Sequence, residues 1–165
     1  MAEREIFQDY MPGAVCFGCG ENNPAGLKIQ SFWEGDEGVC LWQPDERHQG
    51  WEGITCGGII ATLIDCHCMA TAMATAVRNE NRPLSSEPRY RFATGSLNIR
   101  FLKPTPIVQP LLLRAHVTEI KDARKYTLAC DLYADNVNTV AAAVVVGVLV
   151  YRSDRPWEGP GGFKG

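Results

Sequence analysis

Residues 57–77 read GGIIATLIDCHCMATAMATAV and carry one permanently charged side chain, Asp65. Apolar and small residues surround that carboxylate, which predicts a helix from about Cys56 to Arg78 that is buried nearly all round. A buried charge is costly unless it serves a purpose, so Asp65 is the first candidate for chemistry. The two glycines that open the run leave backbone N–H groups free at the helix N-terminus. These features predict an acyl site, with a carboxylate to activate water and N–H donors to hold a carbonyl oxygen.

The neighbours of Asp65 predict a raised pKa for its carboxyl group. Ile64 precedes it and Met69 follows one turn later, so desolvation favours the neutral acid and makes the carboxylate a better base. The alternative is an aspartate placed for the helix dipole. Because Asp65 lies about two turns beyond Gly57, it is past the usual reach of that effect.

The spacing of Gly57 and Asp65 bears on the assembly. Eight residues at about 1.5 Å each separate them by about 12 Å along the helix axis, so one helix cannot bring both groups to one carbonyl. Two helices lying antiparallel across a twofold axis can do so. The sequence therefore predicts a homodimer with an intersubunit site, and a homotetramer built as a dimer of dimers is a further option.

Composition limits the class of protein. A chain of 165 residues with a net charge of -3 and a pI near 5.6 predicts one domain and argues against a nucleic-acid partner. The N-terminus lacks the apolar core of a signal peptide, and the apolar run Val140 to Tyr151 is too short to span a bilayer. Seven cysteines, an odd number, fit a reducing environment. We expect a cytoplasmic protein with no membrane partner.

The remaining pattern predicts an antiparallel sheet interrupted once by the long helix, in the order ββαββββ, over a single domain of residues 1–152. Residues 1–26 are an irregular lead-in, and 153–165 form a flexible tail. The Val and Ala content of the last strand favours burial on both of its faces. The six expected strands are Leu27–Trp33, Gly38–Trp42, Thr94–Lys103, Leu111–Ile120, Tyr126–Tyr133 and Val140–Tyr151.

Three motifs, in order, resemble the acyl-CoA thioesterases of the PaaI-like, phenylacetate-degradation type. They are CFGCG and NPAGL in residues 16–27, HQGWEGITCGG in residues 48–58 with Asp65 behind it, and TGSLNIRFLKP in residues 94–104. The resemblance spans roughly residues 14–152. It implies a hotdog fold, an α+β architecture in which an antiparallel sheet wraps around a long central helix, and the predicted order of elements is what that fold needs.

The resemblance implies a thioesterase that hydrolyses acyl-CoA to a carboxylic acid and free CoA. CoA is then part of the substrate, and no other cofactor is expected. Gly57 would donate its N–H to the thioester carbonyl, Asp65 would act as general base or nucleophile, and Thr94 would orient the attacking water. Strict alternation puts Thr94 on the face opposite Leu97, unless Gly95 forms a β-bulge. The alternative for Thr94 is a strand residue favoured by β-propensity.

Cys56 departs from the family pattern, which commonly has histidine there. A thiol leaving group has a pKa of roughly 8.5, so thioester cleavage needs little acid catalysis and activity can survive this change. Cys56 is either a small buried residue or a reactive thiol at a helix N-terminus. Further substrate-binding candidates are His48, Gln49, Gly50, Cys56 and Gly58 near the carbonyl, and Arg100 and Lys103 for the CoA phosphates or as solvated strand charges.

The cysteines raise the question of a metal site. Cys16 and Cys19 have the spacing of half a zinc site, and Cys66, His67 and Cys68 offer further ligands. Adjacent helical positions diverge by about 100°, so those three cannot converge on one ion. Without a second tight pair we expect no metal, and we expect His67 to be a core histidine that points away from Asp65.

Two other functions remain open. A hotdog groove can bind acyl-CoA without cutting it, although a pure binder gains nothing from burying Asp65. A hydratase or dehydratase acting on enoyl-CoA needs an acid/base pair, for which only His48 is available as the partner.

Overall fold

The computed structural model describes residues 3–13 and 15–157 and confirms the predicted α+β architecture. In chain order the elements are η1 (Phe7–Tyr10), β1 (Ser31–Glu34), β2 (Glu37–Trp42), η2 (Glu46–His48), β3 (Gln49–Trp51), β4 (Ile54–Thr55), α1 (Gly57–Asn79), β5 (Tyr90–Phe101), β6 (Leu111–Lys121), β7 (Lys125–Ala134) and β8 (Asn138–Arg152). The helix and four of the six strands lie close to their predicted ranges, whereas β1 begins four residues after its predicted start at Leu27 and β5 begins at Tyr90, four residues before its predicted start at Thr94.

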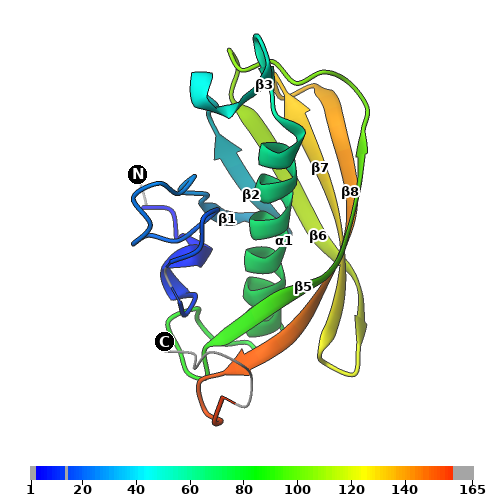
Figure 1. Cartoon of the computed structure of the whole chain (residues 1–165). Coiled ribbons are helices and arrows are strands. Elements are labelled where there is room, and N and C mark those ends of the chain that lie inside the picture. Colours follow the sequence, from blue (N-terminus) through cyan, green and yellow to red (C-terminus); the bar gives the residue numbers. More distant parts are fainter. Residues whose placement is uncertain (1–2, 14, 158–165) are drawn as a thin grey trace.

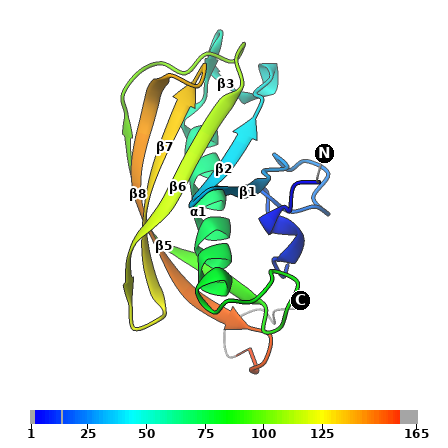
Figure 2. The ribbon, with the colours of Figure 1, turned by 180° about the vertical axis from the view of Figure 1, so that it is seen from behind.

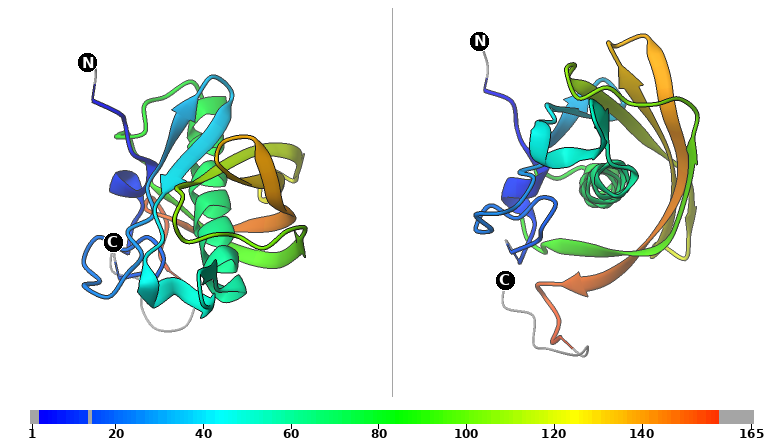
Figure 3. Two further views of the ribbon diagram at one scale, coloured as in Figure 1. Left: turned by 90° about the horizontal axis from the view of Figure 1, so that it is seen from above. Right: turned by 45° about the horizontal axis from the view of Figure 1, so that its top comes forward.

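Six strands form one antiparallel sheet in the order β1-β2-β6-β7-β8-β5. The sheet curves around α1, and the right-hand view of Figure 3, which looks nearly along the helix, shows this wrapping. Figure 1 shows α1 running along the concave face of the sheet. This arrangement is the hotdog fold. It leaves β1 and β5 as the two edges of the sheet.

The central helix owes its place to its composition. Most of its side chains from Ile60 to Val77 are buried, and those of Leu63 and Ile64 are fully covered. By length and hydropathy α1 is apolar enough to cross a membrane, yet 72% of its most apolar stretch is buried inside the protein. The core helix of a folded domain can be as long and as apolar as a membrane span, and the burial of α1 is typical of such a core helix.

The N-terminal lead-in packs on the side of α1 that the sheet leaves open (Figure 2). Phe7 in η1 is fully buried, and its ring lies 5.0 Å from the ring of Trp33. The predicted strand from Leu27 begins only at Ser31, because the N–H groups of Leu27 and Ile29 donate to the loop carbonyls of Phe17 and Gly18 instead of to a strand.

Two further predictions, one for a loop and one for a strand, need correction. The loop expected between Gln43 and Thr55 contains η2 and a small hairpin of β3 and β4. Burial of β8 alternates instead of covering both faces, so Val145 is fully buried while Val144 is 54% exposed. A run of Val and Ala hides this alternation, because both residue types occur on either face of a sheet.

The end of the chain was expected to be a flexible tail over residues 153–165. Of these, Ser153 donates its N–H to the carbonyl of Arg89, and the ring of Trp157 lies 6.3 Å from that of Tyr151. The rest of the expected tail, residues 158–165, lies outside the described residues.

Candidate active site

Asp65 projects from the middle of α1 toward β5, where the hydroxyl group of Thr94 donates a short hydrogen bond to its Oδ1 atom. The carboxyl group is half-buried. Desolvation raises its pKa above the ordinary value, the hydrogen bond from Thr94 lowers it in part, and the nearby Cys16 raises it again. The predicted increase is therefore confirmed in direction. A carboxylate with a raised pKa, held by one hydroxyl group, is a suitable general base.

The contact between Thr94 and Asp65 depends on a β-bulge. Thr94 pairs with Gly147 and Ser96 pairs with Val146, so Gly95 is the extra residue between them. This insertion turns Thr94 toward the helix, on the same face as Leu97, which strict alternation would forbid. The β-bulge that the sequence left open as an alternative at Gly95 is present.

The N-terminus of α1 supplies the second chemical feature. Cys56 is the N-cap residue, and its carbonyl accepts hydrogen bonds from Ile59 and Ile60. Gly57 and Gly58, the first two residues of the helix, are exposed. Their N–H groups have no acceptor inside the helix, and no acceptor is found for them in the part of the chain that the structure describes. They are available to hold a developing negative charge.

An apolar strip on β5 joins these two features. Phe101 lies at the helix N-terminus, where its ring is 3.5 Å from the position that a Cβ atom on Gly57 would take. Leu97 lies between Phe101 and Thr94 on the same face of the strand. Leu97 is 37% exposed and Phe101 is 57% exposed. One chain therefore leaves an open apolar surface between its helix N-terminus and its carboxylate.

The loop before the helix uses its polar side chains internally. The side chain of Gln49 accepts from the N–H of Gly53 at 2.6 Å and donates to the carbonyl of Glu46 at 3.0 Å. The Nδ1 atom of His48 accepts from the N–H of Asp45, and the His48 ring packs 4.8 Å from that of Trp42. Both side chains hold the loop, and the carbonyl of His48 accepts from the N–H of Cys56 at 2.8 Å, so the loop lies beside the helix N-terminus.

Two further candidates in this region are placed by the backbone. A Cβ atom on Gly50 would lie 3.1 Å from Cα of Cys56, so Gly50 packs closely against the helix N-cap. Gly58 accepts from the hydroxyl group of Thr62 through its carbonyl. Both residues shape the helix entrance beside Gly57.

The two basic candidates lie at the same end of the molecule as Gly57. Arg100 is exposed on the outer face of β5, opposite Ala142. Lys103 is exposed just after the strand, and its charge is among the causes that lower the pKa of Asp135. They flank Phe101 and thus the entrance to the apolar strip.

His67 is a core residue, as its position on the helix predicted. It is fully buried, and its Nε2–H donates to the carbonyl of Gly38 at 3.1 Å while Nδ1 accepts from the hydroxyl group of Ser31 at 2.8 Å. Burial lowers its pKa to about 4, so the neutral imidazole is the form in the folded protein.

Sequence reasoning set aside one grouping beside the site, because the chain shows no second tight pair of ligands. Cys66 follows Asp65 and lies against the lead-in, where its Sγ atom is 3.7 Å from Sγ of Cys16. Cys19 completes the group. The CxxC spacing was visible in the sequence, but its third thiol is distant in the chain and only the fold brings it near.

A comparison with models of known protein families identifies the family of the chain. The family model described as Thioesterase superfamily matches residues 52–141, which is more than half of the chain. The chain belongs to the thioesterase superfamily. The match covers all of α1 with Asp65 and all of β5 with Thr94.

Curated relatives of this superfamily member include two acyl-coenzyme A thioesterases named THEM4. The one from Rattus norvegicus is 25% identical over 118 residues, which is 72% of this chain and 45% of that protein. The one from Bos taurus is 25% identical over 137 residues, which is 82% of this chain and 51% of that protein. The chain spans about half the length of the curated relatives it matches.

Solved structures of thioesterases share the fold of this superfamily member. A thioesterase superfamily protein from Shewanella loihica is 32% identical, with a TM-score of 0.58 over 73% of this chain and 89% of that chain. The PaaI protein of E. coli is 13% identical, with a TM-score of 0.60 over 76% and 81% of the two chains. The BH2602 protein of Bacillus halodurans, solved with CoA, is 22% identical, with a TM-score of 0.57 over 76% of each chain.

Proposed function

We propose that this protein hydrolyses acyl-CoA thioesters to a carboxylic acid and free CoA. The observation that carries the proposal is the hydrogen bond between Thr94 and Asp65, on a helix whose N-terminus presents the free N–H groups of Gly57 and Gly58. Membership in the thioesterase superfamily supports the reaction class. The names of the THEM4 relatives and the CoA in the Bacillus halodurans structure support acyl-CoA as the substrate.

In the proposed reaction Asp65 removes a proton from a water molecule that Thr94 helps to orient. The water attacks the thioester carbonyl, and the N–H of Gly57 stabilises the oxyanion that forms. CoA then leaves as a thiolate, whose pKa of roughly 8.5 removes the need for a strong general acid. Cys56 in the position of a histidine is compatible with this chemistry. The raised pKa of Asp65 suits its task as a base.

We infer that the working unit is a homodimer. Gly57 and Asp65 of one chain are about 12 Å apart along α1, while β5 forms an edge of the sheet and leaves Leu97 and Phe101 exposed. Exposed apolar side chains beside an unpaired strand edge favour association with a second copy. Pairing of two such edges would bring Gly57 of one chain to Asp65 of the other. A dimer of dimers is compatible with the same contact.

The polar surroundings suit the rest of the substrate. Arg100 and Lys103 flank the entrance beside Phe101 and would meet the CoA phosphates, because both side chains donate charge-assisted hydrogen bonds. The acyl chain would lie along Leu97.

The expectation of a cytoplasmic enzyme stays a prediction that rests on the cysteine content.

The first experiment measures thiol release from a panel of acyl-CoA substrates that differ in chain length and aromatic character. We expect turnover of at least one class. Protein that binds acyl-CoA tightly and releases no thiol would contradict the proposal and favour the binding module. Loss of the conjugated absorbance of enoyl-CoA without thiol release would favour a hydratase.

The second experiment tests whether the site lies between subunits. Gly57→Pro removes one N–H donor at the first helical position, where proline is well tolerated. The preceding Cys56 has φ -59° and ψ 134°, a conformation that proline accepts in its neighbour. Asp65→Asn removes the base, and the two variants are inactive or nearly so when alone.

Mixing the two inactive variants separates the two arrangements. In an intersubunit site each heterodimer has one intact site, which joins Asp65 of one chain to Gly57 of the other. Random mixing then restores about a quarter of wild-type activity. A site contained within one chain gives no recovery, and that result would refute the dimeric mechanism.

A further inference from the structure

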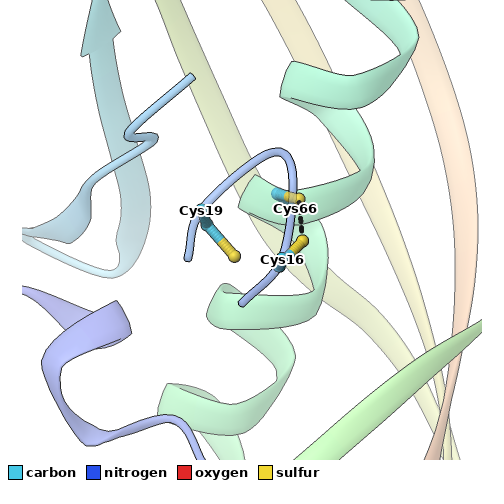
Figure 4. Close-up of side chains that lie close together, drawn as sticks. All are labelled: Cys16, Cys19 and Cys66. Atoms are coloured by element: carbon cyan, nitrogen blue, oxygen red, sulfur yellow. Dashed lines mark hydrogen bonds between the residues drawn. The ribbon is translucent and has the colours of Figure 1, made fainter. Parts of the chain in front are cut away.

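Three thiols converge between the lead-in and the central helix. Figure 4 shows Cys16 and Cys19 on one tight loop and Cys66 on α1, with their sulfur atoms facing one another. All three Sγ atoms lie within 4.8 Å of one another, and those of Cys16 and Cys66 are 3.7 Å apart. A tetrahedral zinc ion with Zn–S bonds of about 2.3 Å holds its sulfur ligands about 3.8 Å apart. The group already has nearly this size.

The loop is shaped to bring its sulfurs to the helix. Between the two cysteines, a Cβ atom on Gly18 would lie 2.3 Å from Sγ of Cys66, so only glycine allows this approach. The N–H of Gly20 donates to the carbonyl of Cys16 at 2.8 Å and closes the turn. The N–H groups of Leu27 and Ile29 donate to the loop carbonyls of Phe17 and Gly18. These backbone hydrogen bonds fix the position of the loop.

The groups around the three cysteines favour their thiolate forms, which are the forms that bind a cation. The N–H groups of Gly18 and Cys19 point at the sulfur of Cys16, and the Arg91 side chain acts on Cys19 from nearby. Backbone N–H donors stabilise a thiolate. One divalent cation with three thiolates has a net charge of -1, and the nearby charges are of both signs, since Arg91 acts on Cys19 and Asp65 acts on Cys16.

Solvent access and ligand number are also suitable. Cys16 and Cys19 are half-buried, which gives an ion a path from solvent, while Cys66 is 8% exposed. The described residues supply three ligand atoms to this group. Zinc completes a tetrahedron of three protein ligands with water, so the fourth position would be open.

We propose that Cys16, Cys19 and Cys66 bind one Zn²⁺ ion and thereby fasten the lead-in to α1. The thiols release their protons to solvent as the ion binds. This inference does not rest on the proposed function. It departs from the sequence expectation of no metal, because the fold supplies the third thiol that CxxC lacks. A disulfide between Cys16 and Cys66 would use only two of the three sulfurs.

The test begins with the full chain purified without chelator. We expect close to one zinc per chain by elemental analysis, and Cys16→Ser and Cys66→Ser to lose most of it. Cys56→Ser is the matched control, because its half-buried thiol lies outside the group. It should keep the zinc. Retention of zinc by Cys66→Ser, or equal loss in all three variants, would overturn the three-thiol site.

A second measurement does not depend on how the variants fold. Wild-type protein stripped of metal is reduced and titrated with Co²⁺, whose thiolate charge-transfer absorbance grows with the number of bound sulfurs. We expect a band of three-thiolate strength that Zn²⁺ abolishes. A band of two-thiolate strength, no band, or a Cys16–Cys66 disulfide in freshly purified protein would contradict the proposal.

The same site predicts a change in stability. Added chelator should lower the Tm of the zinc-loaded wild type, because an ion that binds only the folded state stabilises it. The Tm of Cys66→Ser should be unaffected by chelator. An equal response of both proteins would argue that the ion lies elsewhere.

Discussion

Asp65 and His67 lie two residues apart on the same apolar helix, and their surroundings differ. His67 is fully buried, and each of its ring nitrogens has a partner, Gly38 on one side and Ser31 on the other. Asp65 is half-buried, and among the residues that the structure describes only Thr94 donates to its carboxylate. A polar group whose hydrogen bonds are all made holds the fold, whereas one with open acceptor capacity can take a proton from a substrate.

The partners of the two residues extend this difference. The hydroxyl group of Ser31 also accepts from the side chain of Gln8 at 3.0 Å, so His67 is one member of a chain that ties η1 to α1 and the sheet. Asp65 contacts the edge strand instead, beside the exposed Leu97. The role of an interior polar residue therefore depends on how many of its hydrogen bonds are made within the fold, and the sequence alone does not show this number.

The largest expected effect is on activity at Asp65. Asp65→Asn keeps the shape of the side chain and removes the base, so we expect kcat/KM for acyl-CoA to fall by roughly 100- to 10,000-fold. The Tm should change little. Asp122→Asn makes the same chemical change on an exposed turn and should retain full activity. Near-normal turnover by Asp65→Asn would break the comparison.

A matching substitution at His67 should affect stability instead. His67→Leu is similar in volume but leaves the carbonyl of Gly38 without its buried donor, which costs about 1–3 kcal/mol in the free energy of unfolding. Urea unfolding measures this loss. The folded fraction should retain wild-type kcat. A large fall in kcat with unchanged stability would mean that His67, not Asp65, faces the chemistry.

The buried imidazole also predicts a dependence of stability on pH. The pKa of His67 is about 4 in the folded protein and about 6.5 in the unfolded chain. Its contribution is therefore full above pH 6.5 and is lost as the pH falls from 6.5 to 4, because the unfolded state takes up the proton first. The stability difference between wild type and His67→Leu should shrink over that interval. A constant difference would show that the ring is not held neutral.

A smaller effect is expected at Thr94. Thr94→Val keeps the branched shape but removes the hydroxyl donor to Asp65, so we expect about a tenfold fall in kcat/KM, the value of one hydrogen bond to a charged group. Thr94→Ser keeps the donor and is the matched control. If Val and Ser behave alike, the hydroxyl group does not act on the carboxylate.

The sequence predicted the helix and most strands closely, for a clear reason. The apolar run of α1 is unbroken and bounded by glycines and charges, and its observed bounds, Gly57–Asn79, differ by one residue at each end from the prediction. The β3–β4 hairpin was missed, because Gln49–Thr55 is too short to show a period and contains two glycines.

Within the candidate site, the sequence predicted the features that depend only on neighbouring residues in the chain. The charge of Asp65, the glycines at the helix start and the parity of Thr94 are readable along the chain. The internal hydrogen bonds of Gln49 and the approach of Cys66 to Cys16 are not, since they depend on how a loop closes and on which helix face meets the lead-in. Substrate-binding roles for His48 and Gln49 stay predictions, because the loop that carries them lies beside the helix N-terminus, where the carbonyl of His48 accepts from the N–H of Cys56.

The bulge at Gly95 makes the direction of Thr94 independent of strict strand alternation. Thr94 and Ser96 pair with Gly147 and Val146, which are adjacent on β8, so the ladder continues past Gly95 as if that residue were absent. Deleting Gly95 would therefore leave Thr94 and Leu97 two positions apart and on the same face of the strand. A strand that kept Gly95 without the bulge would turn one of the two side chains outward, so the hydroxyl group reaches the carboxylate only if this one residue is left out of the ladder.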